Sequence, residues 1–295
     1  LLAVAQYEYN RKRSRDSLNQ AILNRFAREG QMSQNHRLIA RLPVDTIWTT
    51  NYDKLIEEAF RHAGRRVDVK SEVEQLAVHR RDTEVTLYKM HGDVDHPHHA
   101  VLTKDDYECY ETGRQAFITY LLSHLLSKRF LFLGFSFTDP NIEYTFNRLR
   151  RLLNPRVVAN QPVRDHYCFL RKPHVEDEKD TIADSAERLR RHEANVARFE
   201  HRIADLQRYG LQTVQLDSYS DITVLLEKLH RRTGFDLAKP GTLPPSASSL
   251  IATAEEAILE VQRASEKEKM IASGVGTPKA LASTIAQDKR LRIAS

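Results

Sequence analysis

The sequence predicts an α/β protein in which a mainly parallel sheet is flanked by helices. Five short runs of β-branched, aromatic or other apolar residues have the composition of buried strands, at residues 46–50, 85–90, 130–133, 167–170 and 212–216. Segments with helical periodicity alternate with these runs, and this alternation favours parallel pairing. The run at 130–133 is apolar at every position, as expected for a strand that helices cover on both faces.

Helical segments precede and connect these strands. Residues 5–29 place Leu18, Ile22 and Phe26 on one face, and Gly30 follows as a stop signal. Further helices are expected over residues 35–40, 54–62 and 114–126. A long helix is expected over residues 180–209, with one apolar seam formed by Ile182, Ala186, Leu189, Val196, Phe199, Ile203 and Leu206. This seam would either dock on its own domain or form an oligomer contact.

Composition changes after residue 235. Residues 236–249 are rich in proline, serine and glycine, which is typical of a flexible linker. Residues 250–295 are expected to form a C-terminal helical extension followed by a mobile tail. The main domain would therefore comprise residues 1–235.

Charge and cysteine content exclude several classes of protein. The 295 residues include 45 Lys and Arg and 40 Asp and Glu, for a formal net charge of +5. Since the two signs are interspersed, we expect no direct binding of nucleic acid. Neither a signal peptide nor the roughly 18 consecutive apolar residues of a membrane span is found, so a cytoplasmic location is expected. The two cysteines, Cys109 and Cys168, exclude a four-cysteine zinc site.

Three polar clusters follow predicted strands. They are Thr49-Thr50-Asn51-Tyr52-Asp53, His91-Gly92-Asp93 and Gly134-Phe135-Ser136-Phe137-Thr138-Asp139-Pro140-Asn141. In open α/β sheets, ligands bind outside the carboxyl ends of the strands, where all three clusters would lie. Taken singly, each cluster has a simpler explanation, because Asn51, Asp53 and Asp139 suit turns and helix N-caps. The coincidence of three clusters favours a functional site.

These clusters resemble the motifs of sirtuins. The first resembles the Thr-Gln-Asn-Ile-Asp element, His91-Gly92 resembles the catalytic His-Gly pair, and Gly134-Phe135-Ser136 resembles the Gly-Thr-Ser loop. The resemblance is closer still to the bacterial sirtuin-like NAD hydrolases of antiphage defence when the longer segments Lys89-Met90-His91-Gly92-Asp93 and residues 131–141 are compared. The resemblance covers roughly residues 5–234. It implies a sirtuin-like Rossmann-type fold and NAD+ as substrate, with no metal.

The resemblance also implies roles for individual residues. Asn51 would position the attacking water beside the nicotinamide ribose, and His91 would bind the ribose hydroxyls and act as general base. Other residues would contact the rest of NAD+, namely Thr49, Thr50, Asp53, Gly92, Gly134, Ser136, Asp139 and Asn141. His91, His96, His98 and His99 are crowded into one segment that could hold a metal, but a solvated loop is the preferred interpretation of this segment.

Two features depart from the sirtuin pattern. The four-cysteine zinc module of sirtuin deacylases cannot form here, which disfavours protein deacylation. The Gly-Ala-Gly-x-Ser loop that opens the family is absent, so we expect a first βα unit with this loop to precede Leu1.

The sequence is compatible with three functions. The first is an NAD-depleting effector in bacterial antiphage defence, regulated by homo-oligomerisation or by a protein partner. The second is a non-catalytic nucleotide-binding or scaffold subunit that joins a HerA-type ATPase or an Argonaute-like protein. The third is a zinc-free ADP-ribosyl transfer enzyme, which would label an acceptor.

Overall fold

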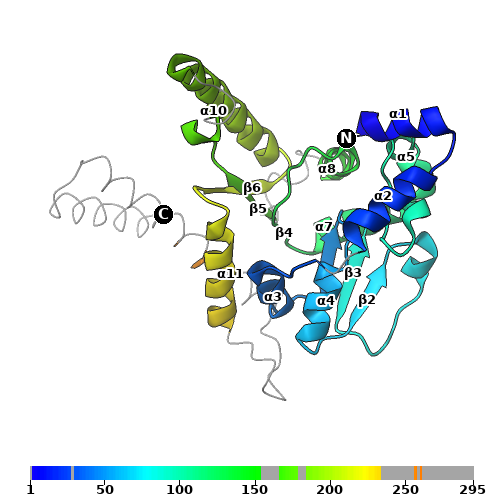
Figure 1. Ribbon diagram of the computed structural model, residues 1–295. Helices are drawn as coiled ribbons and strands as arrows, with labels where there is room; N and C mark the ends of the chain where they lie inside the picture. The colour runs from blue at the N-terminus through cyan, green and yellow to red at the C-terminus, as the bar shows by residue number, and fades with distance from the viewer. Residues whose placement is uncertain are drawn as a thin grey trace.

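The strands in the described part of the chain form two parallel sheets with helices packed around them (Figure 1). The computed structural model describes residues 2–27, 30–153, 166–178, 184–233, 256–257 and 260. One sheet has the order β1-β3-β2, from β1 (Thr46–Thr49), β3 (Val85–Lys89) and β2 (Val67–Lys70). The other has the order β4-β5-β6, from β4 (Leu131–Phe132), β5 (His166–Arg171) and β6 (Leu211–Leu216). Every neighbouring pair is parallel, which confirms the predicted α/β class.

All five expected strands form, whereas β2 was not predicted. Its sequence, Val-Asp-Val-Lys, places two charged residues in a strand interior, where the sequence pattern of a buried strand has apolar ones. The structure resolves this conflict because Asp68 and Lys70 are both buried and form an ion pair at 2.8 Å. Pairing between the two charges thus allows a strand that composition alone argues against.

The expected helix over residues 5–29 is two helices, α1 (Leu2–Lys12) and α2 (Asp16–Phe26). The single-helix prediction was wrong because Arg13 adopts a left-handed backbone conformation with φ of 53°. Ser14 Oγ then accepts a hydrogen bond from Asp16 N at 3.0 Å, which satisfies an amide at the start of α2.

The remaining helices of the described residues occupy the segments between strands and at the ends. They are α3 (Gln34–Ala40), α4 (Leu55–His62), α5 (Lys104–Glu108), α6 (Tyr110–Gly113), α7 (Gln115–Ser127), α8 (Pro140–Leu152), α10 (Ser185–Gln207) and α11 (Ser220–Thr233), with short 3-10 turns at η1 (Val73–Ala77), η2 (Pro97–His99) and η3 (Val175–Glu178). Helix α3 packs on both α4 and α11, as Figure 1 also shows, so it connects the helical layers of the two sheets.

The apolar core extends from the first sheet to the second. Met90, at the end of β3, belongs to the same buried cluster as Ile118 of α7, Phe146 of α8 and Cys168 of β5. Trp48 of β1 stacks on its register partner Tyr88, with ring centroids 4.3 Å apart. Continuous packing of this kind fixes the carboxyl end of β3 relative to α8.

Helix α10 is long, as predicted, and the described part of its apolar seam is only partly covered. Leu206 is buried against the core, whereas Leu189 is 52% exposed and Val196 is only partly buried. In Figure 1 the N-terminal part of α10 projects away from both sheets. Docking on its own domain therefore accounts for the C-terminal end of the described seam, and the oligomer contact stays a prediction.

Some sequence predictions fall where the structure gives no description. The linker at 236–249 lies outside the described residues, as does all of the C-terminal extension apart from residues 256–257 and 260. No helix in the described part of the chain combines the length and hydropathy that crossing a bilayer requires.

Candidate active site

The first two polar clusters lie side by side because β1 and β3 are neighbours. Met90 N donates to Thr49 O at 3.0 Å, which pairs the strands at the point where they end. Beyond the strands, Val94 N donates to Tyr52 O at 3.0 Å. The Asn51 loop and the His91 loop therefore leave the same edge of the sheet and stay in contact.

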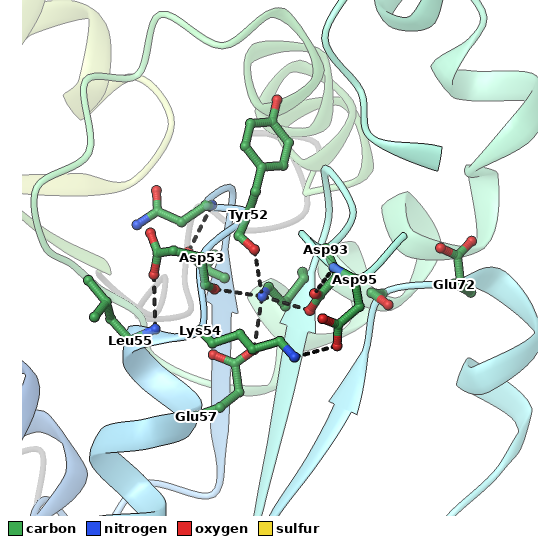
Figure 2. A network of polar contacts seen from close by, with 12 residues as sticks. Tyr52, Asp53, Lys54, Leu55, Glu57, Glu72, Asp93 and Asp95 are labelled. Carbon is green, nitrogen blue, oxygen red and sulfur yellow. Dashed lines mark hydrogen bonds and ion pairs between the residues drawn. The ribbon is translucent and has the colours of Figure 1, made fainter. Parts of the chain in front are cut away.

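A buried lysine, Lys89, joins these two loops, and Figure 2 labels its partners Tyr52, Asp53, Glu57 and Asp93. Lys89 Nζ donates to the carbonyl oxygens of Tyr52 at 3.1 Å and Asp53 at 2.7 Å. It also contacts Glu57 Oε1 of α4 at 2.8 Å and Asp93 Oδ2 at 2.7 Å. The Lys89 side chain is fully buried, so its charge is balanced only inside the protein.

His91 is buried where the two sheets approach one another. Its relative exposure is 3%, its Nε2 lies 3.4 Å from Asp139 Oδ2, and its Nδ1 lies 3.5 Å from Tyr107 Oη. Burial lowers the pKa of His91 below its usual value; Asp139 opposes this shift and Arg114 adds to it. The imidazole is therefore neutral at pH 7, as a general base must be before it accepts a proton.

Asp139 brings the third polar cluster to the other two. It is the N-cap of α8, and its Oδ1 accepts hydrogen bonds from Asn141 N at 2.9 Å and Ile142 N at 3.2 Å. The other carboxylate oxygen accepts a hydrogen bond from Tyr107 Oη at 3.2 Å and faces His91. Asn141 is buried, and its Nδ2 has no hydrogen-bond partner among the described residues. It is a donor suited to a polar substrate group.

Two glycines in the predicted site adopt left-handed conformations. Gly92 has φ of +93°, and a Cβ there would lie 3.1 Å from Ala100 Cα, so neither the backbone angle nor the space suits a side chain. Gly134 has φ of +63° with open space around the position of a Cβ. It lies in the exposed loop after β4, where Ser136 Oγ and Thr138 Oγ1 form a hydrogen bond of 2.7 Å.

The other predicted residues lie at the end of β1 and on the loop after it. Asn51 is exposed and its backbone N–H donates to Thr49 Oγ1 at 3.1 Å, while Thr50 is partly buried. Asp53 Oδ1 accepts a hydrogen bond from Leu55 N at 3.0 Å at the start of α4. The side chains of Thr49 and Asp53 thus shape the turn that presents Asn51.

Sequence reasoning missed Tyr107 and Arg114. A capping box at Thr103 and Asp106 signals the start of α5 in the sequence, but it does not reveal that Tyr107 on this helix faces His91. Arg114 donates to the carbonyl oxygens of Ser71, Met90 and His99, and it holds the segments on either side of the His91 loop together.

Comparison with known proteins agrees with this geometry. A family model described as a SIR2-like domain matches residues 45–194, a range that begins just before β1 and contains all three polar clusters. The chain belongs to the SIR2-like family. The predicted resemblance to sirtuin-like proteins is therefore confirmed.

Curated relatives of this SIR2-like chain carry the name NAD(+) hydrolase ThsA. The protein from Bacillus cereus (strain MSX-D12) is 41% identical over 231 residues, which are 78% of this chain and 45% of the relative. The protein from Cytobacillus dafuensis is 38% identical over 232 residues, covering 79% and 45%. The protein from Enterococcus faecium is 40% identical over 236 residues, covering 79% and 47%. This chain thus spans a little under half the length of these relatives.

Proposed function

We propose that the protein hydrolyses NAD+ at the N-glycosidic bond between nicotinamide and ribose, giving nicotinamide and ADP-ribose. The observation that carries the proposal is the position of His91, a buried neutral imidazole beside the Asn51 loop at the carboxyl ends of parallel strands. The naming of the relatives as NAD(+) hydrolases supports the same reaction.

The reaction suits the available groups. The bond between ribose C1′ and nicotinamide N1 breaks, and its electron pair leaves with nicotinamide, which is neutral and needs no acid. Water attacks C1′ of the oxocarbenium-like transition state, Asn51 orients this water, and its proton passes to His91 and then to solvent. The products are nicotinamide, ADP-ribose and one proton.

The remaining predicted residues are proposed to bind the rest of NAD+ or to shape its site. Asn141 offers an unpartnered buried amide, and the space around Gly134 allows close approach of a substrate to the backbone. Ser136 offers a hydroxyl to phosphate or ribose. Thr49, Thr50, Asp53 and Gly92 support the loops that carry Asn51 and His91, and Asp139 contacts His91.

A further βα unit with a glycine-rich loop is proposed to complete the sheet and to bind the pyrophosphate. Among the described residues, β1 and β4 each pair with a neighbour on one side only, and both are incompletely buried. An open edge of this kind can accept a further parallel strand.

The biological role is proposed to be NAD+ depletion by a cytoplasmic effector of antiphage defence, because the motifs resemble hydrolases of that class. Such an enzyme must be silent before infection, so control by homo-oligomerisation or by a protein partner is part of the proposal. The exposed apolar residues of α10, Leu189 among them, are one surface for such a contact.

The test is nicotinamide release by the protein at its natural length, alone and with its genomic neighbour. Asn51→Ala and His91→Ala should each lower turnover by at least about 100-fold while the protein stays folded. Asn24→Ala and His79→Ala, at exposed positions, are matched controls. NAD+ binding without turnover by the wild type would favour the scaffold function, and labelling of an acceptor would favour ADP-ribosyl transfer.

A further inference from the structure

The groups around His91 come from three separate elements. Asp139 comes from the start of α8, Tyr107 from α5, and the ring of Tyr110 in α6 lies 6.0 Å from the imidazole. Arg114, just after α6, is the cation whose positive charge lowers the pKa of His91. The hydroxyl of Tyr110 donates to Met90 O at 3.0 Å, so it is already engaged. Asp139 is thus the anionic side chain that faces the imidazole.

We propose that Asp139 is a positioning residue for His91: it holds the imidazole with its proton on Nε2, so that Nδ1 accepts the proton in catalysis. The catalytic consequence of this pairing rests on the proposed hydrolase function, but the pairing itself does not. A carboxylate is negatively charged and acceptor-only, so its field favours the tautomer whose proton lies on the imidazole nitrogen that faces it. The nitrogen that faces Asp139 is Nε2, at 3.4 Å, and it has no hydrogen-bond partner among the described residues.

Tyr107 holds the Asp139 carboxylate in place. Its hydroxyl has one proton, which it donates to Asp139 Oδ2 at 3.2 Å rather than to His91 Nδ1 at 3.5 Å. Burial and the neighbouring Asp139 raise the pKa of Tyr107, so the donor stays protonated through the neutral range. With this proton committed to Asp139, Tyr107 has none to donate to His91 Nδ1.

The pairing also balances the charge that forms during catalysis. When His91 accepts a proton it becomes a buried imidazolium, and burial by itself makes this state costly. The Asp139 carboxylate lies close enough to stabilise the new charge. Its other oxygen is fixed by two backbone N–H groups of α8, so little reorganisation is needed.

The informative variant is Asp139→Asn. Asparagine is also a good N-cap, so its oxygen can still accept the hydrogen bonds from α8. The amide nitrogen would face His91 Nε2 as a donor and move the imidazole proton to Nδ1. We expect nitrogen-15 spectra of labelled histidine to show an Nε2–H tautomer in the wild type and an Nδ1–H tautomer in Asp139→Asn. The tautomer is read without substrate, so this result stands even if no NAD+ is hydrolysed.

The kinetic readout separates positioning from folding. Asp139→Asn should lower kcat on the order of 100-fold or more with KM changed less than about threefold, because the base has the wrong tautomer. The acidic limb of the kcat profile should move to lower pH, since the carboxylate that raises the pKa of His91 is gone. Tyr107→Phe should keep the tautomer and lower kcat by only about threefold to tenfold.

A matched control is Asp184→Asn at the N-cap of α10, where the same exchange leaves a helix cap remote in sequence from His91. It should change neither kcat nor the His91 tautomer. An Nδ1–H tautomer in the wild type, or an unchanged tautomer in Asp139→Asn, would overturn the pairing. If the wild type releases nicotinamide but Asp139→Asn matches its kcat, the catalytic role is overturned while the hydrolase function stands.

Discussion

The ammonium group of Lys89 lies 2.7 Å from Asp93 Oδ2, inside the protein, and a second carboxylate, Glu57, contacts it from α4 at 2.8 Å. Burial raises the pKa of Glu57, and Lys89 opposes that shift. One buried cation therefore connects the strand before His91, the loop after it and the helix that follows Asn51. The geometry of the site depends on this charge balance.

Replacing the lysine should be costly, because Lys89→Met leaves two carboxylates without their cation. We expect the free energy of unfolding to fall by about 3–5 kcal/mol, measured by urea denaturation at pH 7. The triple variant Lys89→Met, Glu57→Gln, Asp93→Asn removes the charges together and should recover part of this loss. Equal losses in the single and triple variants would show that charge balance is not the cause.

Gly92 should not tolerate a side chain. In Gly92→Ala the methyl group meets the backbone of Ala100 and the residue keeps a left-handed conformation. We expect a loss of about 2–3 kcal/mol in unfolding free energy and a large loss of nicotinamide release. Gly64→Ala is the control, because Gly64 also has a positive φ but nothing lies within 4 Å of its Cβ position. The idea fails if the two variants are equally stable.

His166 should make stability depend on pH. Burial lowers the pKa of His166 to about 4, with a smaller contribution from Arg129, and its Nδ1 accepts a hydrogen bond from Phe130 N. The unfolded chain binds a proton near pH 6.5, so the folded state loses about 3 kcal/mol of stability as the pH falls from 6.5 to about 4. Above pH 6.5 this group has no effect.

His166→Asn is the variant that isolates this effect. Its side-chain oxygen can replace Nδ1 as the acceptor, but it does not titrate. The difference in unfolding free energy between wild type and variant, followed by urea denaturation, should therefore change between pH 6.5 and pH 4 and be flat above. A constant difference over this range would contradict the assignment.

Arg65 is expected to stabilise the segment that leads into β1. Its guanidinium is buried and donates to the carbonyl oxygens of Ala40, Leu42 and Val44 at 3.1, 2.7 and 2.9 Å. Arg65→Met should leave these carbonyls without that donor and lower the unfolding free energy by about 2–4 kcal/mol. The exposed Arg61→Met in the neighbouring α4 is the control and should change it by less than about 0.5 kcal/mol. A loss in Arg65→Met no larger than in this control would argue against the role.

The sequence by itself determined five of the described strands, their parallel class and the polar clusters that follow three of them. Runs such as the one around Leu131 are apolar at every position, so composition alone identifies them as strands, although Leu131 and Phe132 are only partly buried in the structure. The polar loops follow directly after the strands in the sequence. Because parallel strands end at a common edge of the sheet, these loops can be placed at that edge from the sequence. Asn51, His91 and Asp139 could therefore be singled out before any contact was known.

Tertiary structure decided the partners of these residues. Tyr107 reaches His91 across 16 residues, and Asp139 joins it from the N-terminus of α8, after β4 of the other sheet; neither approach follows from local periodicity. Strand β2 was missed for the same reason, since Asp68 becomes acceptable in a buried strand only when Lys70 pairs with it. Burial makes the energy of a charged group depend on its spatial neighbours, and sequence patterns do not contain that information.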